Sequence, residues 1–305
     1  MGRKIFFLDL DGTLLTDEKL ISADTYSALK KFCEAGNVIA VNSGRPMKSI
    51  TDTMKALKLD IFKEAYAIAF NGAWIRNVKT GEDILKKTVS LEDTLKIAGL
   101  ARAKGLHCQT YSEDHILSSA EDDELFYYKR TVKLPYKILP SFPEGITEAP
   151  CKLLTIKLFG EAADIGHELY LEAMGIHPEK KLKRPGAHYE DTPLPDILKE
   201  LADTVNTEYA GRVSALKSNP YFMEIFPADA GKGEAVHDLA KLLSVDIKDT
   251  LAAGDAENDI SMLEAAGTGI AMFNAEESVK KAADVITLKD NNNDGLAEFF
   301  INNSL

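Results

Sequence analysis

The sequence predicts an α/β fold with a Rossmann-like, three-layer core around a parallel sheet, into which an α+β cap domain is inserted. Continuous apolar runs alternate with amphipathic helical patterns at both ends of the chain, and the connections between them are short. Such runs are typical of parallel strands that are covered on both faces. In the middle of the chain, aromatic and charged segments alternate and are punctuated by prolines, which indicates the insertion. The length of 305 residues allows two domains.

The N-terminal part alternates predicted strands and helices. Residues 4–8 predict the first strand. Ser22 is the expected N-cap of the helix that follows, and Gly36 is its expected end. Residues 37–42 predict the second strand, and Pro46 suits the first turn of the next helix.

The next segments predict a strand that runs into a hairpin and then the inserted domain. Residues 66–75 contain the strand and the first hairpin arm, and a Thr-Gly turn leads to the returning arm. Within the insertion, residues 153–159 and 222–226 are strand candidates, and residues 162–174 are a helix candidate.

Beyond the insertion the first pattern resumes, with strands predicted at residues 250–253 and 269–272, each preceded by a helix. We therefore predict a discontinuous core domain of residues 1–85 and 227–305, and an inserted domain of residues 86–226.

Composition and charge exclude several classes of protein. The net charge of −12, from 36 Lys and Arg against 48 Asp and Glu, argues against a broad surface for nucleic acid or an anionic membrane. It leaves room for a small basic pocket. The three cysteines are widely separated and form no CxxC pair, so a reducing compartment fits better than a disulfide framework or a zinc site. No apolar run approaches the ~20 residues of a membrane span. We expect a soluble, cytoplasmic protein without an obligate protein partner.

Four polar clusters fall where a predicted strand ends or a predicted helix begins. They are residues 9–13, 43–45, 231–233 and 254–259. In an open parallel sheet, ligands bind at the carboxyl ends of the strands, so these clusters could meet. Each cluster alone has an ordinary explanation as a helix cap or a solvated loop. Their occurrence together and in this order favours a single site.

Asp9 and Asp11 raise a question of charge. Residues i and i+2 of a strand point the same way, so the two carboxylates could lie close together and repel each other. A divalent cation between them would make that arrangement tolerable.

The clusters resemble the four motifs of the haloacid dehalogenase superfamily. The matching residues are Asp9-x-Asp11-Gly-Thr13, Ser43-Gly-Arg, Lys232-Gly and Gly254-Asp255-x-x-Asn258-Asp259. The segment Asn71-Gly72-Ala73, the insertion, and Ile270-Ala271-Met272-x-Asn274-Ala275 narrow the resemblance to Cof-type phosphatases with a large α/β cap. The resemblance covers the whole chain. Ser43 replaces a common threonine and keeps its hydroxyl, whereas Phe273 replaces a usual glycine beside Asn274 and puts the substrate contacts of that loop in doubt.

The resemblance implies roles for the acidic residues. Asp9 would be the nucleophile that forms an aspartyl-phosphate. Asp11 would protonate the leaving alcohol and then deprotonate the attacking water. Mg²⁺ would be held by Asp9, by the main-chain carbonyl of Asp11 and by Asp255. Asp259 would orient a metal-bound water or Lys232.

The resemblance also implies a phosphate-binding set. Its members are the Ser43 hydroxyl, the backbone N–H groups of Leu10 and Gly44, Lys232 and the Asn258 amide. Lys232 lies near a predicted helix N-terminus, where the helix dipole favours an anion. The predicted function is a magnesium-dependent phosphatase that acts on a small phosphorylated metabolite, a sugar phosphate or similar polyol.

Three alternatives stay open at this point. Two are related enzymes, a phosphomutase and a disaccharide-phosphate phosphatase. The third is a module that accepts a phosphoryl group without turnover, as receiver domains do. Asp11, placed as an acid and base, and the large cap argue against the third.

Two further features of the sequence need an interpretation. Cap residues that could touch substrate, although packing or surface roles are more common for any one of them, are His107, Tyr111, His115, Arg184, His188 and Tyr189. Residues 290–295 begin like a calcium-binding EF-hand loop, but Ile301 stands where that loop needs a bidentate glutamate. We expect a polar turn in which Asp294 caps a final helix over residues 296–301.

Overall fold

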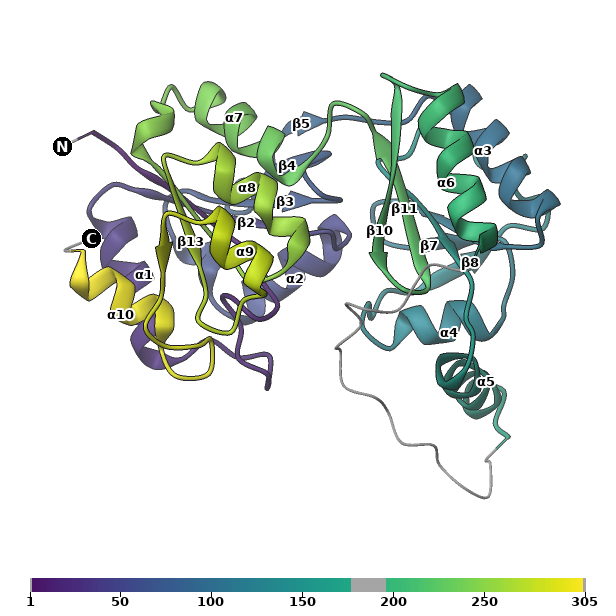
Figure 1. Ribbon diagram of the computed structural model, residues 1–305, viewed down its shortest axis with the longest axis horizontal. Helices are drawn as coiled ribbons and strands as arrows, with labels where there is room; N and C mark the ends of the chain where they lie inside the picture. The colour runs from purple at the N-terminus through teal and green to yellow at the C-terminus, as the bar shows by residue number, and fades with distance from the viewer. Residues whose placement is uncertain (1, 177–195, 304–305) are drawn as a thin grey trace. The chain divides into compact units, whose positions relative to one another are not determined.

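The computed structural model describes residues 2–176 and 196–303, and the chain divides into two compact units (Figure 1). The core unit comprises residues 1–86 and 230–305, and the cap unit comprises residues 87–229.

The core unit is built on one mixed sheet. Its described strands follow the order β14-β13-β12-β1-β2-β3-β4-β5. The pairs from β14 to β3 are parallel, whereas β4 and β5 pair antiparallel at one edge. The strands are β1 (Ile5–Leu8), β2 (Val38–Asn42), β3 (Ala65–Ala69), β4 (Trp74–Asn77), β5 (Asp83–Lys86), β12 (Thr250–Gly254), β13 (Thr268–Ala271) and β14 (Val285–Ile286). The predicted parallel core and the hairpin after its third strand are confirmed.

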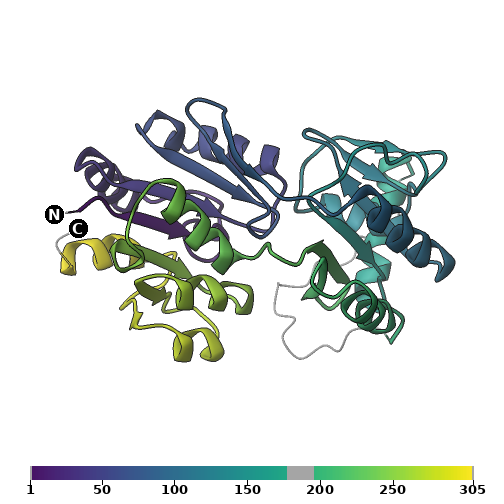
Figure 2. The same ribbon diagram turned by 90° about the horizontal axis from the view of Figure 1, so that it is seen from above.

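Helices cover both faces of this sheet and give three layers (Figure 2). On one face, Phe6 of β1 packs against Phe32 of α1 and Phe300 of α10. Successive side chains of a strand point to opposite faces of the sheet, and α7 and α8 cover the face opposite to Phe6. There the Asn42 amide donates to the Lys232 carbonyl at 3.0 Å and to the Met262 sulfur at 3.4 Å. The helices of the core unit are α1 (Ala23–Glu34), α2 (Met47–Ala56), α7 (Lys232–Leu242), α8 (Ile260–Ala265), α9 (Glu277–Ala282) and α10 (Gly295–Asn302), with short 3₁₀ helices η1 (Leu59–Ile61), η2 (Ile247–Asp249) and η3 (Glu257–Asp259).

Helix ends follow the sequence closely, with one correction. The Ser22 side chain accepts from the Thr25 N–H at 3.1 Å and so caps α1, as predicted. Asp294 occupies the N-cap position of α10, but its side chain makes no capping hydrogen bond. Its φ of 64° lies in the left-handed region, a conformation that does not turn the carboxylate toward the first N–H groups of the helix. The prediction that Asp294 caps this helix is therefore wrong: the residue occupies the N-cap position, but its side chain does not bond to the helix.

The cap unit is an α+β fold with a second mixed sheet, in the order β10-β11-β9-β6-β7-β8. One face carries α3 and α6, whose apolar side chains share a buried cluster with strand residues such as Leu153 and Ile225. Its strands are β6 (His107–Tyr111), β7 (Ile116–Ser118), β8 (Tyr136–Ile138), β9 (Leu153–Ile156), β10 (Val213–Asn219) and β11 (Phe222–Pro227). Its helices are α3 (Leu91–Ala103), α4 (Asp123–Lys129), α5 (Glu161–Ala173) and α6 (Asp196–Glu208). The predicted strand at 153–159 ends early, at Ile156, because the chain turns toward α5 at Gly160.

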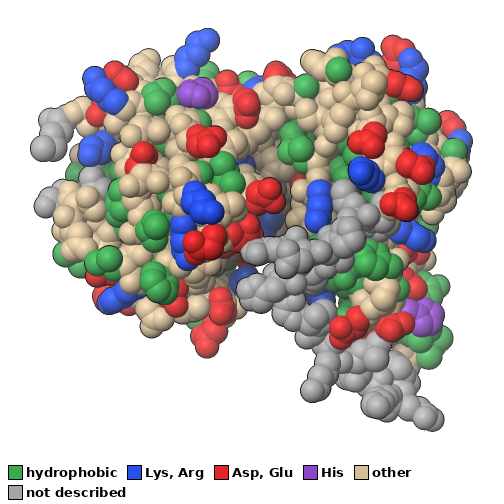
Figure 3. All heavy atoms as spheres, viewed as in Figure 1, with side chains coloured by type: hydrophobic (Ala, Val, Ile, Leu, Met, Phe, Trp, Pro, Cys, Tyr) green, Lys and Arg blue, Asp and Glu red, His purple; other side chains and the backbone are tan. Residues whose placement is uncertain are grey.

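The distribution of surface charge and the state of the cysteines agree with what the composition predicts. On the face seen in Figure 3, acidic and basic side chains are interspersed over the described residues. Cys33, Cys108 and Cys151 are all free thiols. Among the described residues, every helix is too short or too polar to cross a membrane.

Candidate active site

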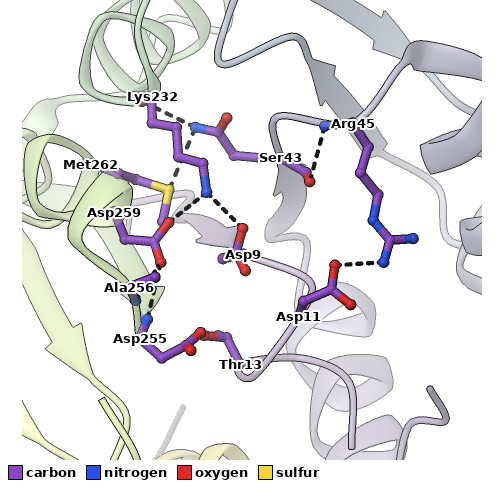
Figure 4. Close-up of polar contacts among 11 residues, drawn as sticks. Asp9, Asp11, Thr13, Ser43, Arg45, Lys232, Asp255, Ala256, Asp259 and Met262 are labelled. Carbon is purple, nitrogen blue, oxygen red and sulfur yellow. Dashed lines mark hydrogen bonds and ion pairs between the residues drawn. The ribbon is translucent and has the colours of Figure 1, made fainter. Parts of the chain in front are cut away.

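The four polar clusters meet at the carboxyl ends of the central strands of the core sheet (Figure 4). Asp9 follows β1, Ser43 follows β2, and Asp255 follows β12, so all three leave the carboxyl ends of neighbouring parallel strands. Lys232 is the first residue of α7, which covers this face of the sheet. The sheet order therefore brings together residues that are more than two hundred positions apart in the sequence.

Lys232 is the buried cation at the centre of the cluster. Its ammonium group donates to Asp9 Oδ1 at 2.6 Å and to Asp259 Oδ1 at 2.5 Å. Only 3% of Lys232 is exposed, and Asp259 is fully buried. Burial alone would lower the pKa of Lys232, but the attraction of Asp259 and Asp9 raises it above its usual value. The lysine is therefore charged and neutralises part of a carboxylate cluster.

Asp259 shapes the loop that carries Asp255. Its second oxygen, Oδ2, accepts from the backbone N–H groups of Asp255 at 3.0 Å and Ala256 at 3.1 Å. Because both oxygens of Asp259 have partners, this residue holds Lys232 and the Asp255 loop in place. This geometry agrees with the orienting role that the resemblance implies.

Asp255 is held from the other side by the first motif. The Thr13 hydroxyl donates to Asp255 Oδ1 at 2.6 Å. Gly12 has a φ of +83°, and a Cβ at this position would lie 2.3 Å from Asp255 Oδ2. Glycine is required there for two reasons, the backbone conformation and the close approach of the carboxylate.

The donor set fits a hard divalent cation. One carboxylate oxygen from each of Asp9, Asp255 and Asp259 lies within 4.8 Å of the others. Burial raises the pKa of Asp9 to about 7, although Lys232 opposes the shift, and burial together with the Asp9 charge raises the pKa of Asp255 to about 8. Ionising both carboxyls is therefore unfavourable unless a cation joins them, and oxygen ligands are those that Mg²⁺ prefers.

Asp11 lies apart from this cluster. Its carboxylate accepts from the Arg45 guanidinium at 2.5 Å and from the Lys19 ammonium at 2.7 Å. Burial would raise the pKa of Asp11, but these two cations together lower it below its usual value. Each carboxylate thus has a basic partner within the chain, and a divalent cation between Asp9 and Asp11 stays a prediction. Binding of a metal by the Asp11 main-chain carbonyl stays a prediction.

The predicted phosphate-binding residues lie within the motif segments, and their binding of phosphate stays a prediction. Ser43 is buried, and its hydroxyl accepts weakly from the Arg45 N–H at 3.4 Å. A Cβ at Gly44 would lie 2.8 Å from the Asn71 side-chain oxygen, so a larger residue there would have to displace the Asn71 side chain. Leu10 lies between the two aspartates, and its side chain is buried. Asn258 is exposed on η3 and has no hydrogen bond within the described part of the chain.

Several residues of the site were not predicted as site residues. Arg45 and Thr13 belong to the motifs that carried the resemblance, so the sequence did contain a pointer to them. Asn42, the last residue of β2, binds the Lys232 carbonyl from a fully buried position, and a polar end to an apolar strand was the available hint. Lys19 carries no comparable sequence pattern.

The candidate substrate-contacting residues of the cap are used in local contacts. His107 is buried, and its ring contacts Asp122 at 2.8 Å and Gln109 at 3.1 Å. The Tyr111 hydroxyl donates to the Tyr128 hydroxyl at 2.7 Å. His115 pairs with the neighbouring Asp114. Arg184, His188 and Tyr189 lie outside the described residues.

Comparison with known proteins identifies the family. The model of the haloacid dehalogenase-like hydrolases matches residues 6–172 and 185–300. A putative phosphatase of Streptococcus pyogenes is 27% identical, over 97% of this chain and 97% of its own. A 5-amino-6-(5-phospho-D-ribitylamino)uracil phosphatase of Bacillus subtilis is 29% identical, over 97% of this chain and 96% of its own. The crystal structure of a haloacid dehalogenase-like hydrolase from Bacteroides thetaiotaomicron has a TM-score of 0.79 at 26% identity and covers 99% of both chains.

The chain therefore belongs to the family of haloacid dehalogenase-like hydrolases. The resemblance inferred from the motifs and the predicted enzyme class, a phosphatase, are confirmed. Enzymes of this superfamily generally use a divalent metal, and Asp9 and Asp255, beside Asp259, offer carboxylate oxygens that suit one.

Proposed function

We propose that this protein is a magnesium-dependent phosphatase that hydrolyses a small phosphorylated metabolite through an aspartyl-phosphate on Asp9. The contact of the Lys232 ammonium with Asp9 and Asp259, beside Asp255, carries the proposal. In this arrangement the proposed nucleophile, Asp9, lies beside one fixed positive charge, the Lys232 ammonium. It also lies beside carboxylate oxygens that would bind a second positive charge, the metal ion. Such charges stabilise the equatorial oxygens of a transferring phosphoryl group.

The reaction divides into two balanced steps. An oxygen of Asp9 bonds to phosphorus while the bond from phosphorus to the substrate oxygen breaks, and Asp11 gives its proton to that oxygen. A water then attacks phosphorus, Asp11 takes the proton of the water, and the bond to Asp9 breaks to release inorganic phosphate.

Asp9 and Asp255, with the main-chain carbonyl of Asp11, would hold Mg²⁺, which when bound neutralises phosphate charge. Ser43, Lys232, Asn258 and the N–H groups of Leu10 and Gly44 would bind the phosphate oxygens. Asp11 has to leave Arg45 and Lys19 to carry a proton, because their charges favour its ionised form.

One relative supports the proposed substrate class. We propose a sugar phosphate or a similar phosphorylated polyol, and the Bacillus subtilis relative is named for a substrate with a phosphorylated ribityl chain. The cap unit is the proposed specificity domain. The three free thiols agree with a cytoplasmic location.

Phosphate release decides between turnover and simple phosphorylation. Incubation with p-nitrophenyl phosphate and Mg²⁺ should release phosphate continuously, and Asp9→Asn should abolish release. The matched control is Asp246→Asn, an exposed aspartate in the core unit, which should behave as the wild type. A stable phosphoprotein without release would instead indicate a phospho-accepting module, and an Asp9→Asn variant with near wild-type activity would refute the nucleophile assignment.

A substrate panel separates the related enzymes. Phosphorylated sugars, polyols and disaccharides should be compared by kcat/KM, with products resolved by chromatography. Release of free phosphate from monosaccharide phosphates supports the proposal. Conversion of one phosphate isomer to another would instead indicate a phosphomutase.

A further inference from the structure

The polar turn at residues 290–295 contacts the loop that carries Asp11, and the function proposed above does not use it. Asp290 organises the turn from within. Its Oδ1 accepts from the Asn293 amide at 2.8 Å and from the Asn292 N–H at 3.0 Å. The Asp290 carboxylate is thus used within the turn itself.

Two asparagines of the turn reach out to residues 11–17, which we call the Asp11 loop. The Asn291 amide donates to the Leu15 carbonyl at 2.8 Å and, more weakly, to Asp17 Oδ1 at 3.4 Å. The Asn292 side-chain oxygen accepts from the Asp17 N–H at 3.0 Å. These bonds join segments about 275 positions apart in the sequence.

A third asparagine links the turn to the start of the same loop. The Asn274 amide nitrogen donates to the Gly12 carbonyl at 2.8 Å, and its oxygen accepts from the Asn291 N–H at 3.1 Å. The Gly12 carbonyl needs a donor and the Asn291 N–H needs an acceptor. These two partners together fix which way the side-chain amide of Asn274 points. Asn274, which the sequence placed beside a doubtful substrate loop, therefore contacts the Asp11 loop.

Gly12, whose carbonyl accepts this bond, lies next to the acidic cluster of Asp9, Asp255 and Asp259. Gly12 packs so closely on Asp255 that a Cβ would overlap its carboxylate, and the adjacent Thr13 donates to that same carboxylate. The Gly12 peptide is thus held by Asn274 on one side and by Asp255 on the other. Displacing it would move Asp11 and Asp255 relative to each other.

We propose that Asn274 and Asn291 are positioning residues of the phosphatase, holding the Asp11 loop in register with Asp255. The proposal rests on the proposed function. Both side chains donate to main-chain carbonyls of the loop, which is the pattern of a clamp. The bonds are exposed or half-buried, so each adds little to global stability, whereas small displacements of catalytic groups have large effects on rate.

Kinetics of four variants test the clamp. Asn274→Ala and Asn291→Ala should lower kcat roughly tenfold or more, with KM for p-nitrophenyl phosphate and the melting temperature little changed. Asn291→Asp should lose as much as Asn291→Ala, because a carboxylate cannot donate to the Leu15 carbonyl. Asn293→Ala is the matched control, since its amide bonds only within the turn, and it should keep wild-type kcat.

Hydrogen exchange gives a readout that does not depend on activity. Backbone amides of the Asp11 loop should exchange faster in Asn291→Ala than in the wild type, while the cap unit is unchanged. Wild-type exchange and wild-type kcat in the Asn274 and Asn291 variants would overturn the proposal, as would an equal kcat loss in Asn293→Ala. If the wild type releases no phosphate, the proposed function fails, and the exchange result still decides whether the clamp exists.

Discussion

Under the proposed function, Mg²⁺ should stabilise this protein, and the stabilisation should depend steeply on pH because the acidic cluster holds protons when no cation is present. Burial raises the pKa of Asp9 to about 7 and that of Asp255 to about 8, against an ordinary value of 3.8. The folded state therefore binds more protons than the unfolded state between about pH 4 and pH 8. In this window the metal-free protein loses stability as pH rises, and above it the loss levels off.

The magnitude follows from the same pKa values. Ionising one such carboxyl in the fold costs roughly 4 to 6 kcal/mol more than in the unfolded chain, at about 1.4 kcal/mol for each pKa unit. Mg²⁺ bound by Asp9 and Asp255 as proposed would remove this cost, and below pH 7 it would have to displace protons from both groups. Lowering the pH from about 8 to about 6 should reduce the stabilisation by excess Mg²⁺ by about 3 kcal/mol, or roughly 6 °C or more in melting temperature.

Thermal unfolding with EDTA or with excess Mg²⁺, followed by circular dichroism across this pH range, measures the effect. Asp255→Asn removes one proposed ligand and one titrating group, so it should lose most of the Mg²⁺ effect and of its pH dependence. Asp246→Asn, exposed in the same unit, should retain both. A Mg²⁺ effect that is equal at the two ends of the range, or that persists in Asp255→Asn, would refute the reasoning.

Three further substitutions test individual charges. Lys232→Met leaves two buried carboxylates without their cation, so urea unfolding should show a loss of about 3–5 kcal/mol together with lost phosphate release. Arg45→Ala removes a charge that lowers the pKa of Asp11, so the alkaline limb of the pH profile of kcat should move to higher pH; an unchanged limb contradicts the acid role of Asp11. Lys152→Met breaks a buried ion pair with Glu224 in the cap unit, 3.1 Å long, and should destabilise that unit, as seen by faster amide exchange there but not in the core.

The sequence was most informative where local pattern determines position. Apolar runs identified β1, β2 and β12, and the polar residue after each run is then forced to the carboxyl edge of a parallel sheet. Asp9, Ser43 and Asp255 could be placed together on that basis alone. Lys232 required only the start of one further helix.

The contacts that depend on loop geometry could not be predicted. Asn274, Asn291 and Asn292 bond to the Asp11 loop across more than 260 positions of sequence, and no periodic pattern connects them. Lys19 reaches Asp11 because the chain folds back after the first motif. The turns of this segment determine that path, and its residue types do not predict it.

The separation of Asp9 and Asp11 has a backbone cause. The Asp9 N–H still donates to Ala253 as a strand residue would, so its side chain continues the alternation of β1 and faces Lys232. At Leu10 the chain leaves the strand, and the N–H of Leu15 returns to the Leu10 carbonyl at 2.8 Å. Asp11 therefore belongs to a turn, where the rule that residues i and i+2 face alike no longer applies. This turn allows one carboxylate to join the buried cluster while the other remains at a more exposed position, where the proposed function needs it to exchange protons with a substrate.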